Sequence, residues 1–170
     1  MILKLFGAAL VLLSCGGVGF SMAARHRREV CALQNLISAI DRIVCELEYK
    51  LSPLPELLRV AGNSAGGVVG EFFLRVSDEL TKQLSPNAAD CFCKSVLASV
   101  NLPDDTRKLL LEMGMSIGQY DTENQINVLN SIRQQADIRV GELTKDMDKR
   151  IRSYQTLGLC AGAAIAILFV

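Results

Sequence analysis

Two uncharged segments close off the ends of this 170-residue chain, and nearly all of its charge lies between them. Residues 5–24 contain no charged side chain, and neither do residues 157–170 at the carboxyl terminus. All 18 Asp and Glu residues, and every Lys and Arg except Lys4, fall between Arg25 and Arg152. This division predicts a polar domain that is tethered to a bilayer at both ends.

The lengths of the two apolar segments differ. At 1.5 Å per residue, twenty residues reach about 30 Å, which is the thickness of the hydrocarbon core. We therefore expect residues 1–24 to form an N-terminal transmembrane helix. The second segment covers only about 21 Å, so residues 154–170 form a C-terminal transmembrane helix only if Tyr154 and Thr156 lie in the interface and the bilayer thins locally. Shallow insertion is the alternative.

Basic residues flank both apolar segments on the side of the central domain. They are Arg25, Arg27 and Arg28 after the first segment, and Lys149, Arg150 and Arg152 before the second. Cytoplasmic flanks of membrane helices carry an excess of Lys and Arg. Both flanks therefore place the central domain, residues 25–153, on the cytoplasmic side of the cell membrane, with both termini on the opposite side.

Small residues recur every three or four positions in both apolar segments. They are Gly16, Gly19 and Ala23 in the first, and Gly158, Gly162 and Ala166 in the second. Small side chains let helix backbones approach closely in lipid. We therefore expect the two segments to pack as an antiparallel pair, although glycine is also simply common in membrane helices.

A cleaved export signal is the alternative for the first segment. Ser21-Met22-Ala23 resembles a cleavage site, and the residues from Leu12 to Cys15 loosely resemble a lipoprotein acylation box. The arginines that follow directly oppose translocation, and the apolar run continues well past Cys15. An exported lipoprotein is therefore the less favoured reading.

The central domain has the apolar periodicity of helices, and the sequence predicts an all-α bundle of about six helices with a transmembrane segment at each end. The first helix runs on from the membrane segment to about Lys50, with charged flanks that include Glu46. The break at 52–56 has Ser52 as a possible cap, and a short helix continues to about Ala61.

Residues 62–67 read as a flexible link. Three further helices carry the apolar stripes Val69-Phe72-Phe73-Val76, Phe92-Val96-Val100 and Leu109-Leu110-Met113-Ile117, and the last runs from about Glu123 into the second membrane segment.

Composition and motifs argue against chemistry in this domain. The charges balance, so no basic field indicates nucleic acid. The glycines at 62–67 lack the Lys-Ser/Thr of a phosphate-binding loop. The six cysteines form no CxxC motif or Cys/His cluster, and His26 is the single histidine. We therefore expect reduced, structural cysteines, no cofactor, no metal, no small-molecule substrate and no enzymatic activity.

Two stretches resemble the stage III sporulation protein AB family. One runs from Leu33-Gln34 through Glu46-Leu47-Glu48-Tyr49 to Ser52-Pro53-Leu54-Pro55-Glu56, and the other is residues 113–121 followed by Asn124-Gln125-Ile126. The apolar ends match the family layout too. One departure is visible, because Cys91 and Phe92 stand where the resemblance implies a tryptophan.

The resemblance implies a membrane scaffold in a secretion-like complex that joins mother cell and forespore. The family's polar domain is similar to the cytoplasmic domains of type II secretion platform proteins. The implied partners are other stage III sporulation membrane subunits and a secretion-type ATPase, for which stage III sporulation protein AA is the counterpart. Candidate docking residues are Pro53, Pro55 and Glu56 in one break, and Gly118 and Asp121 in a second. A self-associating coiled coil is the alternative, since the first and last helices both carry long apolar stripes.

Overall fold

A computed structural model describes residues 2–50, 52–82, 87–117 and 122–169, and it describes side chains within 25–50, 52–82, 87–117 and 122–145. All six elements in these ranges are α-helices, so the predicted all-α fold class is confirmed for them. Their bounds are α1 Ile2–Tyr49, α2 Leu54–Ala65, α3 Gly67–Thr81, α4 Ala88–Ala98, α5 Asp104–Ser116 and α6 Thr122–Phe169.

The chain divides into two compact units. One comprises residues 1–27 and 141–170, and the other comprises residues 28–140. Helices α1 and α6 have residues in both units, which agrees with the prediction that the first and last helices run on into the apolar segments. Helix α1 ends at Tyr49, where the sequence predicted an end at about Lys50. Helix α6 begins at Thr122, where the sequence predicted a start at about Glu123.

Apart from Arg25, Arg27 and Arg28, the predicted membrane features fall outside the described side chains. Among the residues that the structure describes fully, no helix is both long and apolar enough to cross a bilayer. The side chains of the apolar runs at 5–24 and 157–170, including those of the small residues, lie outside the described side chains, as do the basic side chains from Lys149 to Arg152. Transmembrane anchoring and the packing of the two segments therefore stay predictions.

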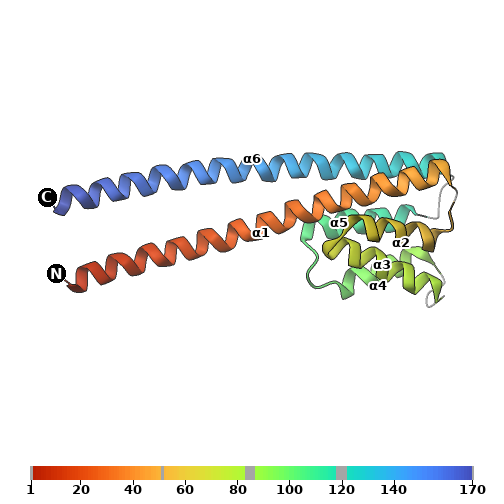
Figure 1. Cartoon of the computed structure of the whole chain (residues 1–170), viewed down its shortest axis with the longest axis horizontal. Coiled ribbons are helices and arrows are strands. Elements are labelled where there is room, and N and C mark those ends of the chain that lie inside the picture. The colour runs from red at the N-terminus through yellow and green to blue at the C-terminus, as the bar shows by residue number, and fades with distance from the viewer. Residues whose placement is uncertain (1, 51, 83–86, 118–121, 170) are drawn as a thin grey trace. The chain divides into compact units, whose positions relative to one another are not determined.

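The core of the 28–140 unit lies where the apolar periodicity places it. In α1 the stripe residues Leu33, Leu36, Ile40 and Ile43 are buried. Their counterparts from the other helices include Leu58, Phe72, Phe73, Leu110, Met113, Leu129 and Ile132. Helices α2, α3, α4 and α5 pack in sequence order, each against the next along α2–α3, α3–α4 and α4–α5. Figure 1 shows α2 and α3 side by side within the unit.

Three phenylalanines form the centre of the core. Phe72 and Phe73 of α3 meet Phe92 of α4 edge to face, with ring centroids 5.6 and 6.4 Å from that of Phe92 and 5.5 Å from each other. Gly114 of α5 lies against Phe92 so closely that a Cβ on the glycine would stand 2.5 Å from the Phe92 Cβ. The missing side chain at position 114 therefore leaves the space that Phe92 occupies.

The expectation of a flexible link at residues 62–67 is wrong. Helix α2 continues to Ala65, and only Gly66 separates it from α3. Gly66 has φ 67° and ψ 179°, a backbone conformation that is essentially restricted to glycine. Gly62 and Gly70 let the two helices approach closely, because a Cβ on Gly70 would stand 2.6 Å from the Gly62 carbonyl oxygen. These glycines serve close packing and a tight reversal of direction.

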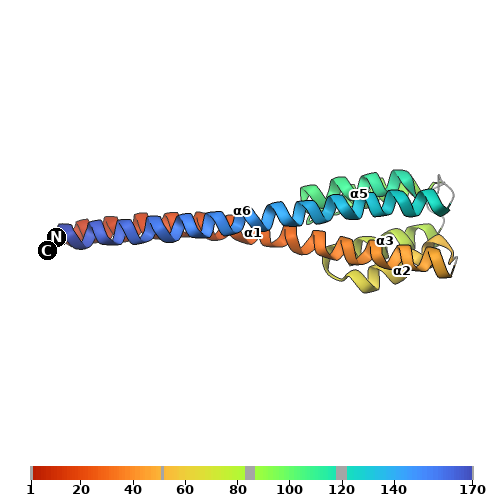
Figure 2. The ribbon, with the colours of Figure 1, turned by 90° about the horizontal axis from the view of Figure 1, so that it is seen from above.

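The helices run in alternating directions, so the 28–140 unit has two ends. At the Glu29 end, Glu29 of α1 meets the first residues of α5, and Asn35 of α1 lies against Gly66 at the α2–α3 turn. The Tyr49 end comprises the last residues of α1, the start of α2 and the start of α6. Figure 2 shows α5 beside α6 in this unit, where Gln135 of α6 hydrogen-bonds to Glu112 of α5.

Candidate docking surface

The turn between α1 and α2 is held by a buried carboxylate. Glu46 is only 4% exposed, although the sequence placed it on a charged flank of the helix. Its Oε1 lies 3.2 Å from Arg42 and 3.3 Å from Lys50, and its Oε2 accepts a hydrogen bond from Ser52 at 3.5 Å. Since a buried charge requires partners, these contacts explain how Glu46 tolerates burial, and they fix the entry to α2.

Two prolines begin α2, and they play different parts. The residue before the helix is Pro53, which makes no side-chain cap, so the expected capping by Ser52 is wrong and its hydroxyl goes to Glu46 instead. Pro53 is exposed. Pro55 lies within the first turn, and its carbonyl accepts a hydrogen bond of 2.7 Å from Ser77 of α3. Pro55 is therefore half-buried and fixed to α3 through its backbone, whereas Pro53 is available at the surface.

Glu56 is exposed and bound within its own helix. Arg59 donates two hydrogen bonds to the Glu56 carboxylate, at 2.8 and 3.0 Å. These bonds lower the pKa of Glu56 and raise that of Arg59 from their ordinary values. The acidic side chain also stands in the first turn of α2, where the helix dipole favours it. A partner at this position meets a fixed ion pair and not an isolated carboxylate.

The strongest apolar feature of this end was not a candidate from the sequence. The Tyr49 side chain is 80% exposed at the last position of α1, directly before the turn that Glu46 holds. The second predicted docking pair, Gly118 and Asp121, lies outside the described residues. Of the five candidates, the structure therefore places Pro53, Pro55 and Glu56 on one connection with Tyr49.

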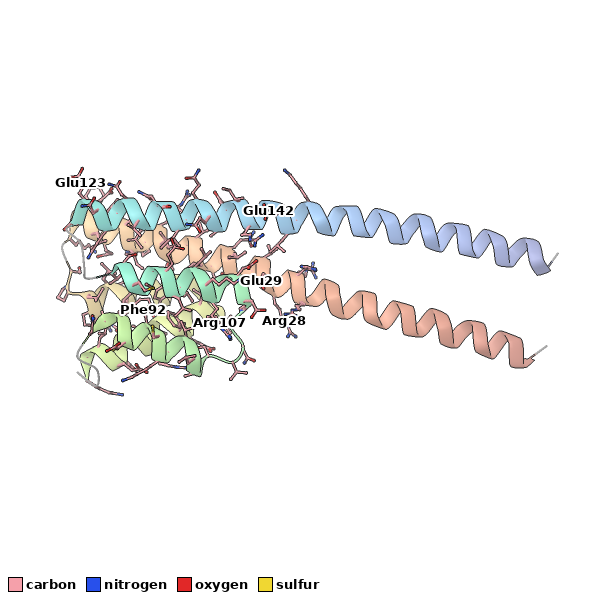
Figure 3. All side chains as sticks on the ribbon, turned by 180° about the vertical axis from the view of Figure 1, so that it is seen from behind. Arg28, Glu29, Phe92, Arg107, Glu123 and Glu142 are labelled. Carbon is pink, nitrogen blue, oxygen red and sulfur yellow. The ribbon has the colours of Figure 1, made fainter. Side chains whose placement is uncertain are left out.

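At the Glu29 end, the start of α5 is capped from another helix. Glu29 of α1 accepts hydrogen bonds from the backbone N–H groups of Asp105 at 3.2 Å and Thr106 at 3.4 Å. Figure 3 shows Glu29 directed at this turn, where Arg107 also lies. Burial raises the pKa of Glu29, while the two backbone hydrogen bonds act in the opposite direction and the charges of Asp105 and Asp104 add to the rise.

The same turn of α5 is bound to α6. Arg139 lies 3.5 Å from the Asp105 carboxylate, which also lies 3.7 Å from Lys108. Helix α5 therefore connects α1 and α6 through its first turn, near the places where both long helices leave the 28–140 unit. Nothing in the sequence spacing indicated this, since Glu29 and Asp105 are separated by 76 residues.

The connection between α4 and α5 leaves apolar side chains in solvent. Leu97 is 83% exposed and Val100 is 86% exposed, so the assignment of Val100 to a buried stripe is wrong. The reason is that α4 ends at Ala98, before Val100 can continue the helical face. Val100 borders a cleft of about 270 Å³ whose lining also includes Phe72, Arg75 and Leu102.

The described residues contain no group of three or more His, Cys, Asp or Glu side chains placed to hold a metal ion. Cys31, Cys45, Cys91 and Cys93 are free thiols, and of these only Cys91 is buried. The basic residues Arg25, Arg27 and Arg28 are exposed.

The chain is similar to a known protein family over nearly its whole length. Residues 4–170 match the family model for stage III sporulation protein AB. The chain is 21% identical over 170 residues to "Stage III sporulation protein AB" of Bacillus subtilis (strain 168), and the alignment covers 99% of each chain. No solved structure gives a significant match.

Proposed function

The chain belongs to the stage III sporulation protein AB family, and from that membership we propose that it is a non-enzymatic membrane platform in sporulation. In this proposal both apolar ends anchor the protein in the membrane of the mother cell. The helical unit faces the cytoplasm and acts by contact with other stage III sporulation membrane subunits and with a secretion-type ATPase. The proposal extends to a secretion-like complex between mother cell and forespore.

The observation that carries the docking part of the proposal is the exposed aromatic side chain on a rigid support. Tyr49 is 80% exposed, and the turn that follows it is held by Glu46 and by the hydrogen bond between Ser77 and Pro55. Aromatic residues are enriched in protein interfaces, and a preorganised site loses less entropy on binding. The Tyr49–Glu56 connection is therefore the surface that we assign to the ATPase.

The test is capture of the co-expressed ATPase by the full-length chain in membranes. We expect Tyr49→Ala to lower the captured amount by roughly tenfold, which corresponds to about 1.4 kcal/mol of binding energy. The paired exchange Glu56→Arg with Arg59→Glu keeps the ion pair but moves each charge by three positions, and we expect it to weaken capture as well. Ile138→Ala is the matched control, because Ile138 is also an exposed hydrophobic residue, at 56%, but lies on α6.

The thermal unfolding midpoint separates docking from folding. Wild-type capture by both the Tyr49 and the Glu56/Arg59 variants refutes docking at this connection. A loss of capture that follows an equal loss of thermal stability instead assigns these residues a structural role. Unchanged stability together with reduced capture is the result that the proposal requires.

The burial of the apolar stripes argues against a self-associating coiled coil. The stripe residues that suggested it, among them Leu33 and Leu36 of α1 and Leu129 and Ile132 of α6, are buried within a single chain. Since their apolar surface is already covered, they offer little for a second copy.

A further inference from the structure

Two large aliphatic side chains stand in solvent at the end of α4. Leu97 and Val100 are three residues apart and are the two most exposed large hydrophobic residues in the described part of the chain, at 83% and 86%. Elsewhere in α4 the apolar residues Phe92 and Val96 are fully buried. Leu97 at the end of α4 and Val100 in the loop that follows are therefore exceptions to the burial of apolar residues earlier in the helix.

The loop that carries Val100 is fixed to the Glu29 end of the unit. The Arg107 side chain donates hydrogen bonds to the carbonyls of Ser99 at 3.2 Å and Leu102 at 3.3 Å. Two residues before it, the Asp105 N–H bonds to Glu29 of α1. The loop is thus connected to Glu29 of α1 through the first turn of α5.

That position lies close in the chain to the first apolar segment. Glu29 follows Ala24, the last residue of the uncharged run, by five residues, which is about 7–8 Å of helix. The polar headgroup layer on each side of a bilayer is about 5–7 Å thick, from the difference between total and hydrocarbon thickness. A segment bound at Glu29 is therefore within reach of the bilayer surface if residues 5–24 span it.

We propose that Leu97 and Val100 form a third membrane contact, in which the end of α4 and the following loop insert their aliphatic side chains into the interfacial layer of the bilayer. This inference rests on the proposed anchoring of the chain by its apolar ends. Its consequence is that the 28–140 unit is restrained against the bilayer at its Glu29 end, leaving the Tyr49 end for a cytoplasmic partner.

The small size of the patch favours lipid over a protein partner. A stable protein interface buries about 800 Å² on each partner, which two side chains do not supply. Shallow insertion of one or two aliphatic side chains is sufficient for a chain that is already anchored, because each buried CH₂ contributes about 0.8 kcal/mol. Lys94 lies one turn before Leu97, and Arg28 is exposed at the same end, whereas the exposed Asp104 opposes strong attraction to anionic lipid.

The contact is tested with the full-length chain in phosphatidylcholine/phosphatidylglycerol vesicles. An environment-sensitive fluorophore is attached to Leu97→Cys or Val100→Cys after the exposed Cys31, Cys45 and Cys93 are replaced by Ser and the two cysteines of the apolar segments by Ala. Tyr49→Cys and Met115→Cys are the matched controls, since both native side chains are exposed, at 80% and 63%. Leu10→Cys reports on the anchoring itself.

We expect lipids that carry a quencher near the headgroup to lower the fluorescence at positions 97 and 100 roughly twofold and to leave positions 49 and 115 unchanged. Quenching of positions 97 and 100 by aqueous iodide, to the same extent as at position 49, overturns the membrane contact. Protection from both quenchers overturns it too, and assigns the patch to a protein partner. Quenching of position 10 by aqueous iodide to the same extent as at position 49 refutes the anchoring, and with it both proposals.

Discussion

The two ends of the 28–140 unit are held together in different ways. At the Tyr49 end, most polar contacts join neighbours in sequence, as in the Glu56–Arg59 pair and the pairing of Glu46 with Lys50. At the Glu29 end, polar contacts join helices that are distant in sequence, as in Glu29 with α5 and Arg139 with Asp105. One end is thus a locally stabilised surface, and the other ties α1, α5 and α6 to one another.

This difference suits the two roles that we propose. A docking surface needs side chains that keep their positions without a partner, and local pairs supply this at small cost in chain entropy. The end at which α1 and α6 leave the unit instead needs contacts that fix these helices relative to α5. Both ends share one feature, which is a glycine on which the helix packing depends.

The largest expected effects come from those glycines. Gly70→Ala at the Glu29 end places a Cβ 2.6 Å from the Gly62 carbonyl oxygen, and Gly114→Ala at the Tyr49 end places one 2.5 Å from the Phe92 Cβ. Overpacking of this kind costs about 2–3 kcal/mol, measured as the free energy of unfolding in urea. Gly141→Ala is the control, because a Cβ there meets nothing within 4 Å, and helix propensity predicts no loss. Equal stability of all three variants contradicts the packing described here.

At the Tyr49 end, Glu46→Ala is expected to lower the free energy of unfolding by about 1–2 kcal/mol through the loss of its charged hydrogen bonds. The effect is limited because Arg42 and Lys50 are 45% and 64% exposed and remain solvated. Glu46→Gln retains an acceptor for Ser52 and should lose less. If Glu46→Ala lowers the free energy of unfolding no more than removal of an exposed carboxylate does, Glu46 does not hold the turn.

At the Glu29 end, Glu29→Ala is expected to cost about 1 kcal/mol, which is typical for removal of a helix N-cap. Hydrogen exchange should rise selectively at the Asp105 and Thr106 amides. Glu29→Gln keeps an acceptor, and protection there should be largely retained. If both variants exchange at the wild-type rate, the carboxylate does not cap α5.

The difference in stability between the wild type and Glu29→Gln should depend on pH, because the pKa of Glu29 is raised. The folded state binds the proton more readily than the unfolded state, so this residue's contribution to stability is fully present below the unfolded pKa and is lost as pH rises through the folded value. The stability of the wild type relative to Glu29→Gln should therefore improve as pH is lowered toward 4.5, the ordinary value. A change in the opposite direction shows that the hydrogen bonds outweigh burial.

The smallest effect is expected for Arg139→Ala. The Arg139 side chain is 50% exposed and the Asp105 carboxylate 24%, so solvent screens their pairing at 3.5 Å. We expect a loss of less than about 0.5 kcal/mol, in the range of exposed ion pairs. A loss larger than that of Glu29→Ala would show that α6, and not α1, mainly fixes the start of α5.

The sequence predicted most of the fold, because helix periodicity and chain breaks are local signals. The buried stripe from Leu33 to Ile43 and the long helices ending at Tyr49 and beginning at Thr122 were predicted correctly. The glycines at 62–67 were misread, since composition does not distinguish a flexible link from a close helix contact. A spacing of eight residues between Gly62 and Gly70 on facing helices was the signal that could have shown it.

The candidate site was predicted only where its contacts are local. Pro53 and Glu56 became docking candidates because a break between helices is visible in the sequence, and their role stays a prediction. The burial of Glu46 could have been inferred from its spacing of three residues after Ile43, on the edge of the apolar stripe. The capping of α5 by Glu29 could not, because it depends on how the helices are placed in space.

The most direct test of the central proposal is the side of the membrane on which the helical unit lies. A single cysteine in place of Glu123, at the exposed start of α6, is compared with one added after Val170, in a chain without its native cysteines. We predict that a membrane-impermeant thiol reagent labels the carboxyl-terminal cysteine in intact cells and position 123 only after permeabilisation. Labelling of position 123 in intact cells contradicts a cytoplasmic platform and any docking of an ATPase to it.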